Sequence, residues 1–413
     1  MAIRKINIGH PLDRLLKASP NGITQEQLNI EDKQRVNLFP WKGQFSPQLI
    51  EVILKEYSNK GETILDPFMG SGTVIYEAGR LGLRAIGSEI NPAAFSLANT
   101  YTLINIATDK RSKLIKVIES KINELVENTL PLFGGKKISN EVCAFERVVE
   151  IYKNTQDTTQ RLVLETVITL LDRKDTAVSI NKISTNWHKL KERILGFPYS
   201  NVPLTCFNCD ARDLPLEDNS IGLVVTSPPY INVFNYHQQY RSSMEGIGWN
   251  LLEVARSEIG SNRKHRSNRF LTITQYILDM ADVFCELNRV VKRSGKVIFV
   301  VGRESNVKKT QFFNSVIIND LVSKVCGFNL KQRQERVFVN RFGSKIYEDI
   351  LYYELTGSPL FGFEREKQLH EIALLTLREA QTRAPRESLA DLTDAIEKVS
   401  VVNKSPLYST NHI

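Results

Sequence analysis

The sequence predicts an α/β fold in which a mostly parallel sheet ends in an antiparallel hairpin and carries a helical insertion. Three observations predict it. Two short apolar runs enclose a glycine loop and a helix between residues 63 and 88, which is the pattern of a βαβ unit. The region 101–200 changes to helical periodicity. Apolar runs then return, and the last two face each other across a turn near Gly343.

Length and composition indicate a globular protein of more than one average domain. The 413 residues are 42% apolar and 24% charged, which is ordinary for a folded chain. We expect four parts: an N-terminal segment with the first part of the sheet domain (1–100), a helical insertion (101–200), the second part of the sheet domain (201–355) and a helical C-terminal tail (356–413). The net charge of +8 suits a polyanionic partner without naming one.

Cysteine usage predicts a reducing compartment, and we expect the cytoplasm. The five cysteines are scattered, and neither a secretory signal nor a long apolar span accompanies them, so we expect no membrane association. Cys206 and Cys209 form a CxxC pair. Because no second pair lies at zinc-site spacing, we expect no metal site.

The first part of the predicted sheet is a strand–helix–strand unit. A helix begins at Pro47, where proline suits a first helical turn. The strand Thr63–Leu65, the helix Val74–Leu81 and the strand Arg84–Ser88 follow in order. Short apolar strands that alternate with a helix predict parallel pairing.

The insertion is predicted from two apolar stripes at helical spacing. Its basic excess is small, which is more typical of a solvated surface than of a DNA-binding face. The stripes consist of Leu114, Ile118, Ile122 and Leu125, and of Leu162, Val163, Val167, Leu170 and Leu171.

The second part of the sheet resumes with "LTCFNCDARDLP" and "SIGLVVTSPPY". A helix over Thr274–Val291 leads into the buried strand of "KRSGKVIFVVG". The segment "RVFVNRFGSKIYEDILYYE" predicts the closing hairpin. The tail from Thr356 shows helical spacing with mixed charge.

A glycine loop, "DPFMGSGT", joins the first strand to the following helix. Gly70 and Gly72 permit close backbone approach to a ligand, although many doubly wound folds turn this way for packing alone. Glu89 ends the next strand about 20 residues later, where a carboxylate can accept both hydroxyls of a ribose. Asp210 ends a further strand in reach of an adenine amino group, with Asp213 as its competitor.

Ser227, Pro228, Pro229 and Tyr230 follow a buried strand directly. The two prolines fix φ and remove two amide donors, which leaves a rigid turn rich in acceptors. A stiff exit loop explains this pattern structurally.

With these residues in view, the chain resembles the amino-group DNA methyltransferases, which methylate cytosine N4 or adenine N6. The resemblance covers residues 39–354 apart from the insertion: "FPWKGQFSP" resembles the segment that closes over the methionine part of the cofactor, "DPFMGSGT" the cofactor loop and "TSPPY" the catalytic tetrapeptide. It implies a Rossmann-like S-adenosylmethionine-dependent methyltransferase fold with S-adenosyl-L-methionine as cofactor. The implied cofactor-binding residues are Phe45, Asp66, Phe68, Gly70, Gly72, Thr73, Glu89 and Asp210. The resemblance also implies that the hydroxyl of Ser227 and the carbonyl of Pro228 accept the N–H bonds of the target amino group and that Tyr230 stacks on the base.

Two departures from the family pattern concern order and length. The cofactor segments precede the catalytic tetrapeptide, which is the reverse of most members with this style of loop. The insertion between Glu89 and Asp210 stands where the family usually has a short connection. These departures leave the location of the target recognition region open.

The resemblance implies a site-specific methyltransferase acting on double-stranded DNA in a restriction–modification system, with a cognate restriction endonuclease as partner. Serine at the first tetrapeptide position favours N4 of cytosine, and N6 of adenine is the alternative. RNA or guanine N2 methylation fits less well. A nucleic-acid-binding protein on an inactive methyltransferase scaffold is the alternative from another class, but Gly70, Glu89, Ser227 and Tyr230 are all present.

A basic segment after the tetrapeptide is the predicted DNA-binding element. A solvated loop is the competing interpretation of such a charge run. If the cations neutralise phosphates, they position the duplex without reading its sequence. The predicted contacts are Arg256, Arg263, Lys264, Arg266 and Arg269.

Overall fold

A seven-stranded sheet organises the chain in the strand order β3-β2-β1-β4-β5-β9-β8. The computed structural model describes residues 10–127, 140–173, 178–231, 236–260, 265, 267–339 and 343–409. The strands are β1 (Thr63–Asp66), β2 (Arg84–Ser88), β3 (Leu204–Phe207), β4 (Ile221–Thr226), β5 (Val291–Gly302), β8 (Phe328–Val339) and β9 (Lys345–Leu355). The first five run parallel to one another, and β9 pairs antiparallel with both β5 and β8. The predicted α/β fold with a closing hairpin is therefore confirmed.

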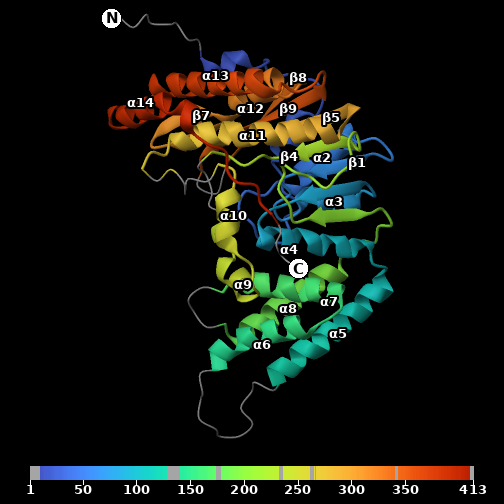
Figure 1. The fold of residues 1–413 in the computed structure, drawn as a ribbon. Coiled ribbons are helices and arrows are strands. Elements are labelled where there is room, and N and C mark those ends of the chain that lie inside the picture. Colours follow the sequence, from blue (N-terminus) through green and yellow to red (C-terminus); the bar gives the residue numbers. More distant parts are fainter. Residues whose placement is uncertain are drawn as a thin grey trace, which may run out of the picture.

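Helices cover both faces of the sheet (Figure 1). On one face lie α2 (Pro47–Tyr57), α3 (Thr73–Arg80) and α4 (Pro92–Thr100); on the other lie α11 (Leu271–Val290), α12 (Asn314–Lys324) and α13 (Gly362–Gln381). Adjacent strand residues point to opposite faces, so Ile64 joins one core and Leu65 the other. The near-continuous apolar character of β4 follows, since both of its faces are buried.

The helix starts that border the crevice have local causes. Asn91 caps α4 by accepting the backbone N–H groups of Ala93 and Ala94, and Pro92 occupies the first helical position. The helix α3 follows Gly72, whose φ of 87° places it in the left-handed region. These caps fix the turns that follow β1 and β2.

The region predicted to be helical consists of α5 (Thr108–Glu127), α6 (Asn140–Asn154), α7 (Thr158–Leu170) and α8 (Ile180–Leu195). It extends away from the sheet beyond α4 (Figure 1). Its apolar side chains continue the core under α4 rather than forming a separate one. The buried guanidinium of Arg111 donates to the backbone carbonyls of Leu103 and Phe197, which ties the insertion to its two connections.

Two short helices, α9 (Arg241–Gly246) and α10 (Leu251–Ser257), follow β4 in the chain and lie between the sheet and the insertion (Figure 1). The remaining elements are α1 (Gln25–Asn29), a two-stranded sheet of β6 (Glu304–Val307) and β7 (Thr310–Phe313), α14 (Leu389–Glu397) and the short 3-10 turns. Within the described ranges, no helix is long and apolar enough to cross a membrane.

The end of the sequence differs from the predicted helical tail. Helical structure stops at Val401, and residues 402–409 have no regular secondary structure. Pro406 disfavours the helical conformation at Ser405, and the carbonyls of both residues are bound by Arg212 instead of a helix. The predicted helical tail is therefore helical only up to Val401, and residues 402–409 are an irregular segment.

The strand order reverses beside β1, whose neighbours are β2 and β4. In open parallel sheets, the crevice at the carboxyl ends of the strands next to such a reversal is the usual ligand site. Glu89, Asp210 and Ser227 follow the ends of β2, β3 and β4, so the topology brings these three side chains to one edge.

Candidate active site

One cavity lies at this edge and contains about 1010 Å³ of empty space, open solvent included. Its walls come from the segment before α2, the glycine loop, the ends of β2, β3 and β4, and the end of α10. The predicted residues that line it are Phe45, Phe68, Gly70, Thr73, Glu89, Asp210, Ser227, Pro228, Pro229 and Tyr230. The sequence-based set is thus largely brought together in space.

Two predicted cofactor-binding residues, Asp66 and Gly72, do not belong to the cavity lining. The Cβ atom of any side chain at residue 72 would lie 2.8 Å from Cα of Ala98 and 3.0 Å from a ring carbon of Tyr101. Residue 72 therefore faces α4 rather than the cavity. Glycine is required there by this close helix contact and by the positive φ.

Asp66 stabilises the start of the glycine loop through hydrogen bonds. Its Oδ1 accepts the hydroxyl of Thr226 at 2.7 Å and the backbone N–H of Phe68 at 3.1 Å. The carboxyl is 1% exposed, and burial raises its pKa to about 7 against the lowering effect of these two donors. Asp66 thus joins the end of β1 to the end of β4, directly behind the Ser-Pro-Pro-Tyr turn.

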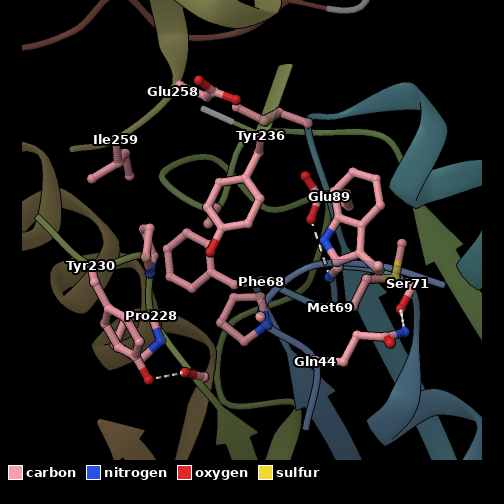
Figure 2. Close-up of a pocket in the computed structure, with 18 of the residues that line it drawn as sticks. Gln44, Phe68, Met69, Ser71, Glu89, Pro228, Tyr230, Tyr236, Glu258 and Ile259 are labelled. Carbon is pink, nitrogen blue, oxygen red and sulfur yellow. Dashed lines mark hydrogen bonds between the residues drawn. The ribbon is translucent and has the colours of Figure 1, made fainter. Parts of the chain in front are cut away.

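Glu89 faces the glycine loop from the end of β2. Its Oε2 accepts the Gly70 N–H at 3.1 Å (Figure 2), and its Oε1 accepts the Asn91 N–H at 2.8 Å. Burial, with a smaller contribution from the nearby carboxylates of Glu258 and Asp66, raises the pKa of Glu89 to about 7 against the lowering effect of the two backbone bonds. A carboxylate has about four acceptor positions, so the two backbone bonds leave capacity for a ligand.

Asp210 lines the cavity but is already well supplied with donors. Arg212 contributes its backbone N–H at 3.0 Å, Nε at 2.9 Å and Nη2 at 2.6 Å, and the Tyr408 N–H adds a bond of 3.0 Å. A ligand amino group at this carboxylate would share an oxygen with one of these donors. Asp213, the competing candidate, does not line the cavity.

The Ser-Pro-Pro-Tyr turn (227–230) forms the wall opposite Glu89. The Ser227 hydroxyl and the Tyr230 hydroxyl lie 2.8 Å apart and share a hydrogen bond (Figure 2). Burial raises the pKa of Tyr230 well above its usual value, so the phenol keeps its proton. Tyr230 also packs closely on Gly302, because a Cβ atom there would lie 3.2 Å from its ring.

Aromatic side chains that the sequence did not single out complete the cavity. The Trp41 ring stacks on Tyr236, with ring centroids 6.3 Å apart and planes inclined by 10°. Figure 2 shows the Tyr236 ring pointing into the cavity toward Phe68, with Glu89 beside it. Trp41 lies within the quoted segment "FPWKGQFSP", whereas nothing in the sequence near Tyr236 indicated a position in this wall.

Glu258, at the end of α10, is a second lining residue that sequence patterns missed. One carboxylate oxygen accepts the backbone N–H of His237 and the other contacts Nδ1 of the same residue, both at 2.6 Å. Asn91 donates to the carbonyl of Tyr236 at 3.0 Å. The backbone on both sides of the Tyr236–His237 bond is therefore held in place, which orients the Tyr236 ring.

The predicted DNA-binding cations are only partly covered by the structure. Arg256 lies in the last turn of α10 and Arg269 directly before α11, and both are exposed. Arg263, Lys264 and Arg266 fall outside the described residues.

Thiol and metal chemistry is not indicated at the cavity. Cys209 lines it, and burial, with Asp210 nearby, raises the pKa of this thiol to about 12. A neutral thiol is a poor nucleophile. Across the described part of the chain, no three His, Cys, Asp or Glu side chains are grouped so that they could hold a metal ion.

Comparisons with known proteins give a family match and several relatives. Residues 18–100 match a family model for N6/N4 methyltransferases that is described as DNA methylase. Type II methyltransferase M.MjaII of Methanocaldococcus jannaschii is 33% identical over 102 residues, which are 24% of this chain and 18% of that protein. Type II methyltransferase M.BsoBI of Geobacillus stearothermophilus is 22% identical over 313 residues, which are 62% of each chain. Both matches thus span less than two thirds of the relatives' own lengths.

Among solved structures, a SAM-dependent methyltransferase from Methanosarcina mazei matches with 12% identity and a TM-score of 0.34, covering 74% of this chain and 97% of that one. The PH0226 protein from Pyrococcus horikoshii matches with 12% identity and a TM-score of 0.33, over 74% and 88% of the two chains.

Proposed function

We propose that the chain is an amino-group DNA methyltransferase and that it transfers a methyl group from S-adenosylmethionine to the exocyclic N4 of cytosine in double-stranded DNA. The family model that matches residues 18–100 and the two type II methyltransferase relatives support this proposal. One observation carries the proposal. A single cavity is lined by the Ser-Pro-Pro-Tyr turn (227–230) on one side and by Glu89 and the glycine loop on the other. A methyl donor and an amino acceptor can therefore meet within it.

The cavity residues fit S-adenosylmethionine. Glu89 retains acceptor capacity for the two ribose hydroxyls, and the absence of a side chain at Gly70 keeps the loop open beside Trp41. Phe68, Ile90 and Ile259 supply apolar wall for the adenine and the methylene groups. When bound, the cofactor supplies an electrophilic methyl group on a sulfonium.

The Ser-Pro-Pro-Tyr turn is suited to an exocyclic amino group. The lone pair of such a nitrogen is delocalised into the ring, so the nitrogen is a poor nucleophile until its N–H bonds are engaged. The Ser227 hydroxyl and the Pro228 carbonyl can accept these two N–H bonds. Two consecutive prolines hold the acceptors in place before the base arrives, which lowers the entropy cost of alignment.

The aromatic residues of the cavity suit a base that has left the duplex. A flipped base gains from stacking, and Tyr230, Tyr236 and Phe68 are the rings available at this wall. Carbon methylation of cytosine needs a thiolate that attacks the pyrimidine ring. Cys209 is unsuited to this role because its thiol is neutral.

Cytosine N4 is preferred over adenine N6 because of the family association of Ser227 with cytosine, and adenine N6 is the alternative. The relatives carry the name type II methyltransferase, which supports a role in a restriction–modification system with a cognate endonuclease as partner.

Transfer of a labelled methyl group tests the proposal. The protein is incubated with methyl-labelled S-adenosylmethionine and either mixed-sequence duplex DNA or RNA, with Ser227→Ala as the matched control. We expect label in DNA for the wild type, none in RNA and none with the variant. Equal labelling by wild type and Ser227→Ala would contradict the proposed site.

A further inference from the structure

Residues 402–409, here called the strap segment, return to the cavity edge from the opposite side of the molecule. After α14, the strap segment runs down beside α10 toward α4 (Figure 1). Tyr408 is 8% exposed and packs in a small apolar cluster with Ala93, Met244, Leu251 and Val254. This cluster joins the helix after Glu89 to the two helices that follow the Ser-Pro-Pro-Tyr turn.

Arg212 anchors the strap segment to the sheet domain. Its guanidinium side chain is 1% exposed and donates to the carbonyls of Ser405 at 2.9 Å and Pro406 at 2.8 Å. The Ser405 N–H in turn donates to Asp279 of α11 at 2.8 Å. A buried guanidinium needs its donors satisfied, so these carbonyls complete the Arg212 site.

Tyr408 contacts residues of two cavity walls without lining the cavity itself. Its backbone N–H donates to Oδ2 of Asp210 at 3.0 Å. Its hydroxyl donates to Asn208 Oδ1 at 3.0 Å, and Asn208 Nδ2 donates to the carbonyl of Glu89 at 2.7 Å. One residue therefore holds both the Asp210 carboxylate and, through Asn208, the backbone of the ribose-binding position.

We propose that Tyr408 is a positioning residue of the cofactor site, which fixes Asp210 through its backbone N–H and Glu89 through Asn208. The inference rests on the proposed function, because it assigns Tyr408 to the binding of S-adenosylmethionine. Asp210 is only 3% exposed, so loss of the Tyr408 N–H leaves one acceptor position of its carboxylate without a donor. Asp210 and Arg212 then shift to recover a bond, and the wall of the cavity shifts with them.

Proline at residue 408 isolates the backbone contribution. Both Tyr408→Pro and Tyr408→Ala remove the ring and its hydroxyl, but only Tyr408→Pro also removes the N–H, so the difference between them reports the bond to Asp210. Asn403→Pro is the matched control: it places a proline at an exposed residue of the same segment. Val402, which precedes it, already has the extended conformation (ψ of 129°) that a residue before proline requires.

Calorimetric titration with S-adenosylmethionine, together with the melting temperature of each variant, is the measurement. We expect Kd for Tyr408→Pro to exceed that of Tyr408→Ala by at least about tenfold, as for a hydrogen bond to a charged acceptor. Asn403→Pro should bind like the wild type. Equal affinities for Tyr408→Pro and Tyr408→Ala would overturn the inference, and so would tighter binding by Tyr408→Pro, since that would mean competition with the ligand.

Tyr408→Phe gives a test in a variant that retains the ring and the N–H. Only the bond to Asn208 is removed, so we expect KM for S-adenosylmethionine to rise several-fold, as for one neutral hydrogen bond, with kcat unchanged at saturation. A lowered melting temperature with unchanged KM would show a merely structural role and overturn the inference. Wild-type protein that binds no S-adenosylmethionine would instead overturn the proposed function itself.

Discussion

At the scale of single residues, Glu89 is a buried carboxyl group whose charged form is the better acceptor for the proposed ribose hydroxyls. Its pKa of about 7 results mainly from desolvation and lies well above the usual range of a glutamate. The two backbone bonds from Gly70 and Asn91 orient the carboxylate without fully offsetting that burial. The same group therefore binds protons and, as we propose, ribose hydroxyls in competition.

This competition predicts a pH-dependent affinity. Below pH 7, Glu89 is largely protonated in the free protein, and the charged form that accepts the hydroxyls is depleted. The affinity for S-adenosylmethionine should fall as the pH decreases from 8 to 6, approaching about tenfold per pH unit below the pKa. Calorimetry at several pH values measures this dependence.

Glu89→Gln should bind weakly at every pH with a flat profile, because the amide does not titrate. Glu165→Gln is the matched control, since burial also raises the pKa of Glu165 to about 7 but its side chain lies in the insertion, outside the cavity lining. The prediction fails if the wild-type affinity does not vary with pH, or if Glu165→Gln removes the variation.

Ser227 is the residue on which the proposed chemistry depends. Its hydroxyl touches Tyr230 rather than any proposed cofactor-binding residue, so Ser227→Ala should abolish or strongly reduce kcat with little change in the affinity for S-adenosylmethionine. Tyr230→Phe keeps the ring and removes the bond to Ser227. We expect it to retain cofactor affinity with a smaller loss of rate. Single-turnover kinetics with parallel calorimetry separate the two effects, and a parallel loss of affinity in Ser227→Ala would contradict its assignment.

At the scale of elements, the turn between β1 and α3 contains two glycines, and the structure around each one favours glycine for a different reason. Gly70 borders the cavity, whereas Gly72 lies against α4. A larger side chain at residue 72 would therefore act through the packing of α3 on α4 and not through the space for the cofactor.

Gly72→Ala should lower the free energy of unfolding by roughly 1–3 kcal/mol from overpacking, in addition to the strain of a positive φ. Gly61→Ala is the matched control, because Gly61 has a φ of 84°, near the 87° of Gly72, and a Cβ atom at residue 61 would have no neighbouring atom within 4 Å. Denaturant unfolding of both variants separates the two effects. Equal losses of stability in the two variants would show that the packing against α4 contributes nothing.

The sheet could be predicted because its strands are short apolar runs with clear turn residues between them. The helix over residues 274–291 was also predicted well and is Leu271–Val290 in the structure. The lining residues that were predicted lie in motifs that are continuous in sequence or, like Glu89 and Asp210, at the ends of predicted strands. Tyr236, Glu258 and Tyr408 belong to the cavity region because α10 and the strap segment pack there, and no local pattern encodes such long-range packing.

The strap segment also shows why composition misled at the end of the sequence. Helical spacing continues up to residue 397, so extending the helix through the tail was the natural expectation. The helix α14 ends at Glu397, and the strap segment beyond it is bound in a non-helical conformation by Arg212, which donates to the carbonyls of Ser405 and Pro406.

At the scale of the whole molecule, the insertion, α9 and α10 extend from the sheet domain on the side where the cavity lies (Figure 1). Arg256 and Arg269 are exposed at the two ends of the segment that joins α10 to α11. A duplex that delivers a base to Ser227 is expected to pass these residues.

Replacing Arg256 and Arg269 by Ala should weaken binding to all duplexes and lower the slope of log affinity against log salt by about 0.9 for each phosphate that the arginines neutralise. Lys292 and Arg293 are the control pair, because they are exposed at the start of β5, the end of the strand away from the cavity. Fluorescence anisotropy over a salt series measures the slopes. Weaker binding to one duplex sequence alone would assign these residues to sequence reading instead.

The identity of the methylated nucleoside tests the central claim most directly. Duplex DNA treated with the protein and S-adenosylmethionine is digested to nucleosides and analysed by mass spectrometry against N4-methyldeoxycytidine, N6-methyldeoxyadenosine and 5-methyldeoxycytidine standards. We predict N4-methyldeoxycytidine, formed by the wild type and not by Ser227→Ala. N6-methyldeoxyadenosine would keep the site and select the alternative base. DNA without a methylated nucleoside, or with 5-methyldeoxycytidine, would contradict amino-group methylation at the Ser-Pro-Pro-Tyr turn.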